Sequence, residues 1–242
     1  MRDYKVEFDK RVEFVRNLLR ESGAKGVVFG NSGGKDSALV GTICKAACDN
    51  TIGVIMPCGT SVNYGSDTED ALRLAEQMGI ETRTVDITST RDAAIASLAG
   101  VTELNSAAIT NMAPRLRMLT LYSLAASENL LVAGTGNKSE IFMGYFTKWG
   151  DGASDFDPIA DLTVTEVYEF MAYLDLPMSI QKKAPSAGLF EGQTDEKEMG
   201  VSYAAIDRYI RGEEVTKEEA AIIERFHSRS EHKRKWRNDY QG

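Results

Sequence analysis

The sequence predicts an α/β fold in which a doubly wound parallel sheet carries helices on both faces. Short apolar segments alternate along the chain with longer segments whose apolar residues recur every three or four positions. The first apolar segment, Gly26–Gly30, runs into a glycine-rich turn that opens a helical pattern. Strands of a parallel sheet are covered on both faces and therefore read as continuous apolar runs. Ligands of such sheets bind beyond the carboxyl ends of the strands, at the point where the strand order reverses.

The first third of the chain predicts the order βαβαβ after an initial helix. That helix is indicated by a stripe of apolar residues ending before Ser22-Gly23, namely Tyr4, Phe8, Val12, Val15 and Leu19. The predicted strands are Gly26–Gly30, Thr51–Met56 and Glu81–Ile87, with Val85 and Ile87 facing inward. A helix through Ala38, Leu39, Ile43 and Ala46 follows the first strand, and a capping box at Ser66–Glu69 opens the next helix.

The rest of the chain predicts further helices around one more strand. Ser89–Glu128 reads as mostly helical with an interruption near Pro114, and Leu130–Gly134 reads as the fourth strand. A glycine-rich, aromatic passage follows, and later helices are indicated by capping boxes at Thr163–Glu166 and Thr216–Glu219. Lys182–Gly200 reads as a loop, which we expect to act as a mobile lid. Since there is no internal repeat or low-complexity linker, we expect residues 1–242 to form a single domain.

Composition narrows the class of protein. No apolar run approaches the roughly 20 residues that a membrane span needs, so we expect no membrane partner. The N-terminal segment lacks the apolar core of a signal peptide, and three cysteines at unhelpful spacings favour a reducing compartment, which predicts a cytoplasmic protein. A net charge of −8 argues against general nucleic-acid binding.

The turn after the first strand, GNSGGKDS, is suited to hold phosphate. It fails the Walker A pattern, because Phe29 stands where glycine is required and Asp36 where a hydroxyl is required. Ser32-Gly33-Gly34 nevertheless brings consecutive backbone N–H groups to the start of a helix, which forms an anion-binding nest. Asp36 fits among phosphates if Mg²⁺ lies between them. The alternative is a simple helix-capping turn.

This turn resembles the SGGxDS signature of the ATP pyrophosphatase (PP-loop) superfamily, whose members release pyrophosphate from ATP. The signature alone leaves open NAD synthetase, GMP synthetase, asparagine synthetase and tRNA-modifying enzymes, and its lysine is also found in tRNA-thiolation branches.

Four further segments resemble the NAD synthetase family, in its order and over nearly the whole chain. They read NMAPRLRM, GTGNKSEIFMGYFTKWGDGASDFDPIADL, PSAGLFEGQTDEKEMG and His232-Lys233-Arg234. The resemblance is to the ammonia-dependent branch, since we expect no glutaminase domain. It implies a fold of the adenine-nucleotide alpha-hydrolase type and ATP-dependent amidation of deamido-NAD by ammonia, with AMP and pyrophosphate as the other products.

The resemblance also implies site residues. Catalytic roles fall to Asp36, Glu140 and Lys148, and Asp36 and Glu140 would hold Mg²⁺ from two loops. ATP contacts are implied at Gly30, Asn31, Ser32, Gly33, Gly34, Lys35, Asp36, Ser37, Thr135 and Ser186. Deamido-NAD contacts are implied at Arg115, Lys148, Asp155, His232 and Lys233. The resemblance further implies a homodimer, and we expect the interface at Ser106–Glu128 with Leu130–Phe146.

One position departs from the family pattern. Relatives often carry Tyr-Lys-Thr after PIADL, with the lysine on ATP, whereas this chain has Thr163, Val164 and Thr165. Lys35, Lys182 or Lys183 would have to supply the missing charge.

Two other functions remain open at this point. One is another PP-loop adenylating enzyme, such as a tRNA thiolase or a nucleotide amidotransferase. The chain lacks both the Cys-x-x-Cys pairs typical of thiolases and a basic overall charge. The other is a non-catalytic adenine-nucleotide sensor, which would need the phosphate nest but not both acidic residues.

Overall fold

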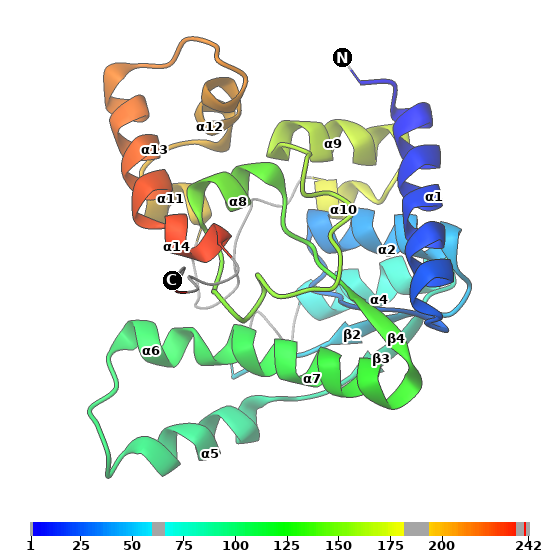
Figure 1. Cartoon of the computed structure of the whole chain (residues 1–242), viewed down its shortest axis with the longest axis horizontal. Helices are drawn as coiled ribbons and strands as arrows, with labels where there is room; N and C mark the ends of the chain where they lie inside the picture. Colours follow the sequence, from blue (N-terminus) through cyan, green and yellow to red (C-terminus); the bar gives the residue numbers. More distant parts are fainter. Residues whose placement is uncertain (1, 60–65, 182–193, 236–239, 241–242) are drawn as a thin grey trace.

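The computed structural model of the chain describes residues 2–59, 66–181, 194–235 and 240, and it confirms the predicted α/β class (Figure 1). The sheet is parallel and has the strand order β3-β2-β1-β4. Its strands are β1 (Gly26–Gly30), β2 (Thr51–Ile55), β3 (Glu81–Thr84) and β4 (Leu130–Ala133). The chain builds outward from β1 to β3 and then returns to place β4 on the other side of β1. The strand order therefore reverses between β1 and β4.

The helices are named here as in Figure 1. They are α1 (Tyr4–Ser22), α2 (Lys35–Ala47), α4 (Ser66–Met78), α5 (Thr88–Leu98), α6 (Ser106–Thr110), α7 (Met112–Glu128), α8 (Lys138–Met143), α9 (Val164–Tyr173), α10 (Met178–Gln181), α11 (Asp195–Met199), α12 (Tyr203–Ile210), α13 (Lys217–Arg229) and α14 (Glu231–Arg234).

The predicted third strand and the predicted long helical stretch differ from the observed elements. The strand predicted over Glu81–Ile87 ends at Thr84, although Val85 and Ile87 still donate backbone hydrogen bonds to Ile55 and Pro57 and turn toward the interior as expected. The helical stretch is divided into α5, α6 and α7. Pro114 lies in the first turn of α7, where its missing N–H costs no helical hydrogen bond, so the interruption falls just before it, at Asn111.

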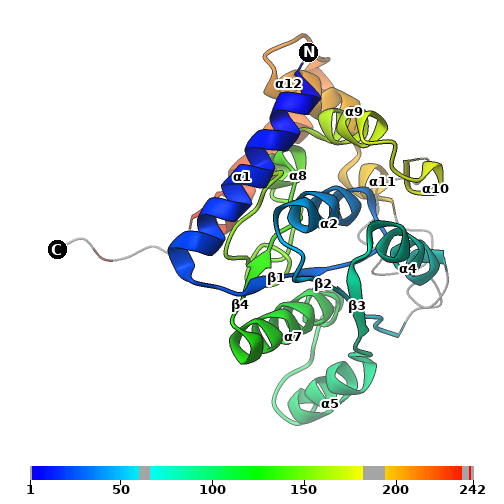
Figure 2. The same cartoon turned by 90° about the vertical axis from the view of Figure 1, so that its right-hand side faces the viewer.

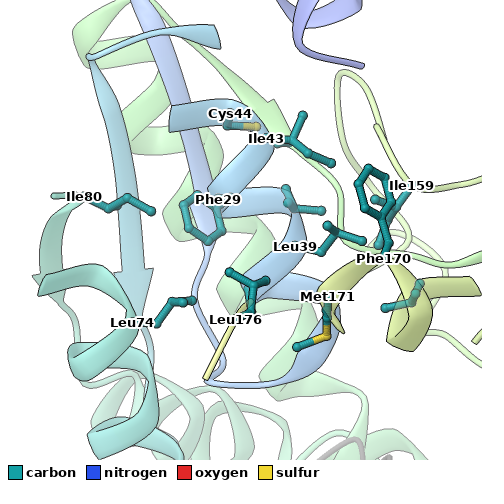
Figure 3. Close-up of a cluster of buried hydrophobic side chains, with 14 of the residues drawn as sticks. Phe29, Leu39, Ile43, Cys44, Leu74, Ile80, Ile159, Phe170, Met171 and Leu176 are labelled. Carbon is teal, nitrogen blue, oxygen red and sulfur yellow. The ribbon is translucent and has the colours of Figure 1, made fainter. Parts of the chain in front are cut away.

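Helices cover both faces of the sheet, as the apolar strands predict (Figure 2). On one face, β1 packs against α1, α2 and α9 in the largest apolar cluster, in which Phe29, Leu39 and Phe170 are fully buried (Figure 3). On the other face, Val28, Ile52 and the side chains of α7 form a second cluster. Both clusters fix β1 and the turn that follows it.

A third apolar cluster joins the C-terminal helices to α8 and α9. Within this region Asp207 of α12 is fully buried, and its carboxylate accepts hydrogen bonds from Ser139 Oγ of α8 and from the backbone N–H and hydroxyl of Thr165 in α9. The predicted loop Lys182–Gly200 is wrong over its last part, where α11 is helical; its residues 182–193, with the proposed lid and Ser186, lie outside the described residues. None of the described helices is long and apolar enough to cross a bilayer.

Candidate active site

Two loops meet at the carboxyl edge of the sheet, where the strand order reverses. One joins β1 to α2, and the other joins β4 to α8, and β1 and β4 pair directly. Asn137, the N-cap of α8, donates a hydrogen bond from Nδ2 to Asp36 Oδ1 at 3.1 Å. The two segments that the sequence singled out, GNSGGKDS and TGNKSE, are therefore in contact.

The expectation that Asp36 and Glu140 lie on loops is wrong. Asp36 is in the first turn of α2, and Glu140 is in the first turn of α8. The sequence Asn137-Lys-Ser-Glu140 forms a capping box, in which Glu140 Oε2 accepts from the backbone N–H of Asn137 and Asn137 Oδ1 accepts from that of Glu140. The second carboxylate thus has a fixed place close to the first helix.

Lys35 lies between these two carboxylates. Its Nζ is 2.7 Å from Asp36 Oδ2 and 3.7 Å from Glu140 Oε1, and its side chain is only 7% exposed. Burial alone would lower the pKa of Lys35, but the charges of Asp36 and Glu140 outweigh it, so the pKa stays above its ordinary value. Burial and the charge of Asp36 raise the pKa of Glu140. The three side chains form one buried charged group.

Two residues that the sequence analysis did not assign lie beside this group. The Tyr203 ring centroid is 5.9 Å from Lys35 Nζ, and the Tyr203 hydroxyl donates to buried Asp195 at 3.1 Å. Asp195 belongs to the quoted segment PSAGLFEGQTDEKEMG, so the motif carried a signal for it, whereas Tyr203 stood outside every motif. Through these two residues, α11 and α12 border the charged group.

The structure bears on the missing lysine at position 164. Val164 is 4% exposed and lies in the same apolar cluster as Tyr203. Three lysines were considered as sources of the missing charge. Of these, Lys35 has its ammonium 5.9 Å from the centroid of the Tyr203 ring, which packs in the same cluster as Val164. Residues 182 and 183 lie outside the described residues.

The turn after β1 has the features of an anion nest. Gly33 has φ 72°, a left-handed conformation that favours glycine, and Gly34 is the N-cap of α2. The first N–H groups of α2 have no intrahelical acceptor, so they are available to a ligand. The hydroxyls of Ser32 and Ser37 lie 3.2 Å apart at the same place.

Asn31 has a different position from the other residues of the turn. Its side chain is 2% exposed, its Nδ2 donates to Ala71 O of α4, and its backbone N–H donates to Val54 O of β2. These contacts give Asn31 a structural role in holding the turn against the rest of the fold.

Basic residues from three distant segments gather near the start of α7. Arg115 Nη2 lies 3.5 Å from Lys148 O, and the Lys148 ammonium donates to His232 O of α14. Lys233 instead donates to Gly144 O and Phe146 O, at 2.8 and 2.6 Å. Desolvation lowers the pKa of Lys233. The structure therefore brings Arg115, Lys148 and His232 together, and it uses Lys233 to attach the tail to the segment after α8.

Three other residues are separate from these groups. The Asp155 carboxylate lies beside β4, where it accepts hydrogen bonds from the backbone N–H of Val132 and from the Tyr122 hydroxyl. Thr135 lies in the loop between β4 and α8, beside Gly136, whose N–H donates to Asp157. Arg117 was not assigned a role in the sequence analysis, yet it is half-buried and its guanidinium donates to Met56 O just past the end of β2.

The carboxylates of Asp36 and Glu140 fit a Mg²⁺ site whose other ligands would come from bound phosphate and water. Within the described residues no group of three or more His, Cys, Asp or Glu side chains is arranged to hold a metal. The pair Asp36 and Glu140 already shares one cation, the Lys35 ammonium, which shows that both carboxylates face a common position. Two carboxylates with phosphate oxygens and water are a usual coordination set for Mg²⁺.

Several known proteins are similar to this chain in sequence and in structure. A family model described as NAD synthase matches residues 7–237. The chain is 44% identical over 236 residues to an NH3-dependent NAD synthetase from Carboxydothermus hydrogenoformans, with 96% of each chain covered. Among solved structures it resembles an NMN synthetase from Francisella tularensis (39% identity, TM-score 0.94, all of both chains) and an NH3-dependent NAD synthetase from Campylobacter jejuni (30% identity, TM-score 0.82, all of both chains).

Proposed function

The chain belongs to the NAD synthase family, and from this we propose that it is a ligase that uses ATP and ammonia to amidate the nicotinate carboxylate of deamido-NAD, giving NAD, AMP and pyrophosphate. The observation that carries the proposal is the meeting of Asp36, Lys35 and Glu140 at the starts of two helices, directly beyond two adjacent strands.

The reaction needs positioning and charge stabilisation more than a protein nucleophile. A carboxylate resists ammonia because its carbon is electron-rich and an oxide is a poor leaving group. Attack of the carboxylate oxygen on the α-phosphorus of ATP forms an acyl-adenylate and breaks the bond to pyrophosphate. Ammonia then adds to the carbonyl carbon, AMP leaves, and the added nitrogen loses one proton to solvent.

The turn after β1 is suited to the leaving pyrophosphate. The N–H groups at the start of α2, together with the Ser32 and Ser37 hydroxyls, would donate to its oxygens. Asp36 and Glu140 would hold Mg²⁺, which would supply positive charge to stabilise the negative charge that develops on the phosphates.

The cluster of Arg115, Lys148 and His232 is suited to the other substrate. Deamido-NAD carries a nicotinate carboxylate and two phosphates, and charge-assisted hydrogen bonds from basic side chains are the strong contacts for such groups. Three segments far apart in the sequence supply this cluster. We assign it to substrate orientation, with Lys148 nearest the reacting carboxylate.

Removal of either acidic side chain tests the metal assignment. We predict that Glu140→Gln and Asp36→Asn each lower kcat at least about 100-fold at saturating Mg²⁺, while circular dichroism shows a folded protein. Glutamine can keep the capping hydrogen bond of Glu140, so the fold should survive.

Glu219→Gln is the matched control. Glu219 occupies the same capping-box position at the start of α13, away from the sheet edge. Its variant should retain wild-type turnover. Near-normal turnover of Glu140→Gln would remove Glu140 from the metal site.

A second candidate substrate is favoured by one comparison. The structure with TM-score 0.94 over the whole chain is that of an NMN synthetase. The same chemistry on nicotinate mononucleotide would give NMN, and the two substrates share the nicotinate carboxylate and its ribose phosphate. They differ in the adenylate half, so discrimination depends on contacts beyond the basic cluster.

The decisive experiment measures products from both nucleotides. Purified enzyme with ATP, Mg²⁺ and ammonium is given deamido-NAD or nicotinate mononucleotide, and NAD, NMN and pyrophosphate are separated by chromatography. We expect the higher kcat/KM with deamido-NAD; a higher value with the mononucleotide would assign NMN synthesis instead. Formation of neither product would contradict the proposed amidation and favour a sensor or another adenylating enzyme.

Ammonium should support turnover and glutamine alone should not. Hydrolysis of glutamine commonly requires a nucleophilic thiolate. Cys44 and Cys58 are buried, and burial raises the pKa of the Cys44 thiol. Sustained turnover with ammonia-free glutamine would contradict this prediction.

We also propose a cytoplasmic homodimer. Its interface would use Ser106–Glu128 and Leu130–Phe146, and an exposed apolar side chain, Leu119 of α7 (56% exposed), supports this face. Leu119→Lys should shift the mass in light scattering toward the monomer; an unchanged dimer mass would place the interface elsewhere.

A further inference from the structure

Lys35 has a geometry that its helix does not explain. Lys35 and Asp36 are consecutive residues of α2, and consecutive side chains of a helix point in different directions. The Lys35 ammonium nevertheless lies 2.7 Å from the Asp36 carboxylate, and the same nitrogen reaches Glu140 of α8 at 3.7 Å. The long side chain therefore turns back to the point at which the two carboxylates converge.

We propose that Lys35 is an internal counter-ion that occupies the cation position between Asp36 and Glu140 in the ligand-free enzyme and leaves it when a divalent cation binds there. The inference rests on the proposed function only for the identity of the cation as Mg²⁺. The geometry itself comes from this chain's own side chains.

Burial explains why such a counter-ion is needed. Asp36 and Glu140 are 16% and 18% exposed, and two carboxylates facing one position at low exposure repel each other strongly when no cation lies between them. Asp195 adds a third buried carboxylate behind Tyr203. A lysine held at this point keeps the two helix starts together without metal.

The contact of Lys35 with Asp36 and Glu140 predicts that its ammonium competes with a divalent cation. A divalent cation and the ammonium need the same carboxylate oxygens, because Asp36 Oδ1 is already used by Asn137 and Glu140 Oε2 by the backbone of Asn137. The oxygens facing Lys35 are Asp36 Oδ2 and Glu140 Oε1. If these oxygens held a divalent cation, the ammonium would be displaced and could contact a phosphate bound in the turn after β1. Lys35 would thus be a positioning residue before ATP binds and a phosphate contact afterwards.

The test is the affinity for Mn²⁺ alone, in the absence of ATP and nicotinate nucleotide. Electron paramagnetic resonance counts free Mn²⁺ during titration of wild type and of Lys35→Met, whose side chain has a similar length but no charge. We expect Lys35→Met to bind Mn²⁺ at least about tenfold more tightly, because the competing ammonium is gone. A merely structural role for Lys35 would leave affinity unchanged or weaken it.

Thermal unfolding gives a second measurement. In EDTA the unfolding midpoint of Lys35→Met should lie about 5–10 °C below that of wild type, because the two carboxylates have lost their counter-ion. Addition of Mg²⁺ should raise the midpoint of Lys35→Met by more than it raises that of wild type. Lys45→Met, in the last turn of the same helix, is the control and should show neither effect.

Other outcomes decide the question as clearly. Equal or weaker Mn²⁺ binding by folded Lys35→Met would overturn the proposal. If neither Lys35→Met nor Lys35→Gln folds at saturating Mg²⁺, the proposal also fails, since a cation would then not replace the ammonium. None of these readouts depends on turnover, so failure of the proposed amidation would be seen separately in the product assay.

Discussion

At the scale of single residues, Gly144 has no space for a side chain. It ends α8 in a left-handed conformation, with φ 65°, and a Cβ at this position would overlap the Cβ of Ser230. Ser230 in turn donates to Met143 O. We predict that Gly144→Ala lowers the free energy of unfolding by about 2–4 kcal/mol, from backbone strain and from overpacking together. Urea unfolding measures this loss.

Gly79 provides the matched comparison. It has a similar φ of 63°, but among the described residues no atom lies within 4 Å of the point that an alanine Cβ would occupy there. Gly79→Ala should therefore cost only the backbone strain, about 1 kcal/mol. Equal losses for the two variants would show that contact with Ser230 does not matter.

The residues of the candidate site were partly predictable from sequence. Asp36 and Glu140 belong to motifs, and parallel strands deliver the ends of β1 and β4 to one edge, so the proximity of these two residues followed from the fold class. The path of the Lys35 side chain did not follow, because it depends on Glu140, which is about 100 residues away and is placed by tertiary pairing of β1 with β4. Tyr203 was missed for the same reason.

At the scale of elements, an ion cluster fastens the start of α1 to the start of α9. Arg2 donates from Nε to Glu166 and from Nη1 to Asp161, each at 2.8 Å. Although partial burial opposes ionisation, hydrogen bonds from Thr163 and Arg2 hold the pKa of Glu166 below its usual value, and Arg11 and Arg2 lower the pKa of Asp161. These pKa shifts make the cluster sensitive to acid.

The direction of the pH effect follows from the lowered pKa values. A carboxyl group whose pKa is lower in the folded state contributes stability above about pH 4, and this contribution is lost as the pH falls through the folded pKa. We predict that Arg2→Met costs about 1 kcal/mol at pH 7, a small value because the groups are partly exposed, and that the difference from wild type shrinks below pH 4. Urea unfolding at pH 7 and pH 3.5 tests this.

An exposed pair on the same helix is the control for this experiment. Lys5 and Asp9 are 74% and 64% exposed, so Lys5→Met should leave stability unchanged at both pH values. A loss for Arg2→Met that is equal at both pH values would show that the carboxylates are not responsible.

Elements with strong local signals were predicted well, and short ones were not. The capping boxes at Thr163 and Thr216 correctly predicted the starts of α9 and α13. Helices α8 and α11 have only six and five residues, too few for an apolar period to be read, and isolated helices of that length are not stable without tertiary packing. Buried Met143 and Met199 supply that packing, within the cluster of the C-terminal helices.

At the scale of the whole molecule, one buried carboxylate adds polar contacts to the apolar cluster that joins the C-terminal helices to α8 and α9. Asp207 receives hydrogen bonds from α8 and α9, and no part of it is exposed. We predict that Asp207→Asn lowers the free energy of unfolding by about 2–3 kcal/mol, because the amide cannot accept all three hydrogen bonds. Hydrogen exchange should accelerate in α12 and α13 more than in β1 and β2.

Glu224→Gln serves as the control, since Glu224 accepts an exposed hydrogen bond from Tyr209. Its exchange pattern should match wild type. Uniform acceleration over the whole chain in Asp207→Asn would show instead that the C-terminal helices and the sheet unfold as one unit.

The strand order also has a consequence for the protein while it is being made. β1 pairs on one side with β2, which follows soon after it, but on the other side with β4, whose partner residues leave the ribosome roughly 100 residues later, about 5–20 s at usual rates of synthesis. During that interval the nascent chain exposes one unpaired side of this apolar strand. Stalled chains that end before residue 130 should therefore bind chaperones, and chains extended past β4 should be released from them.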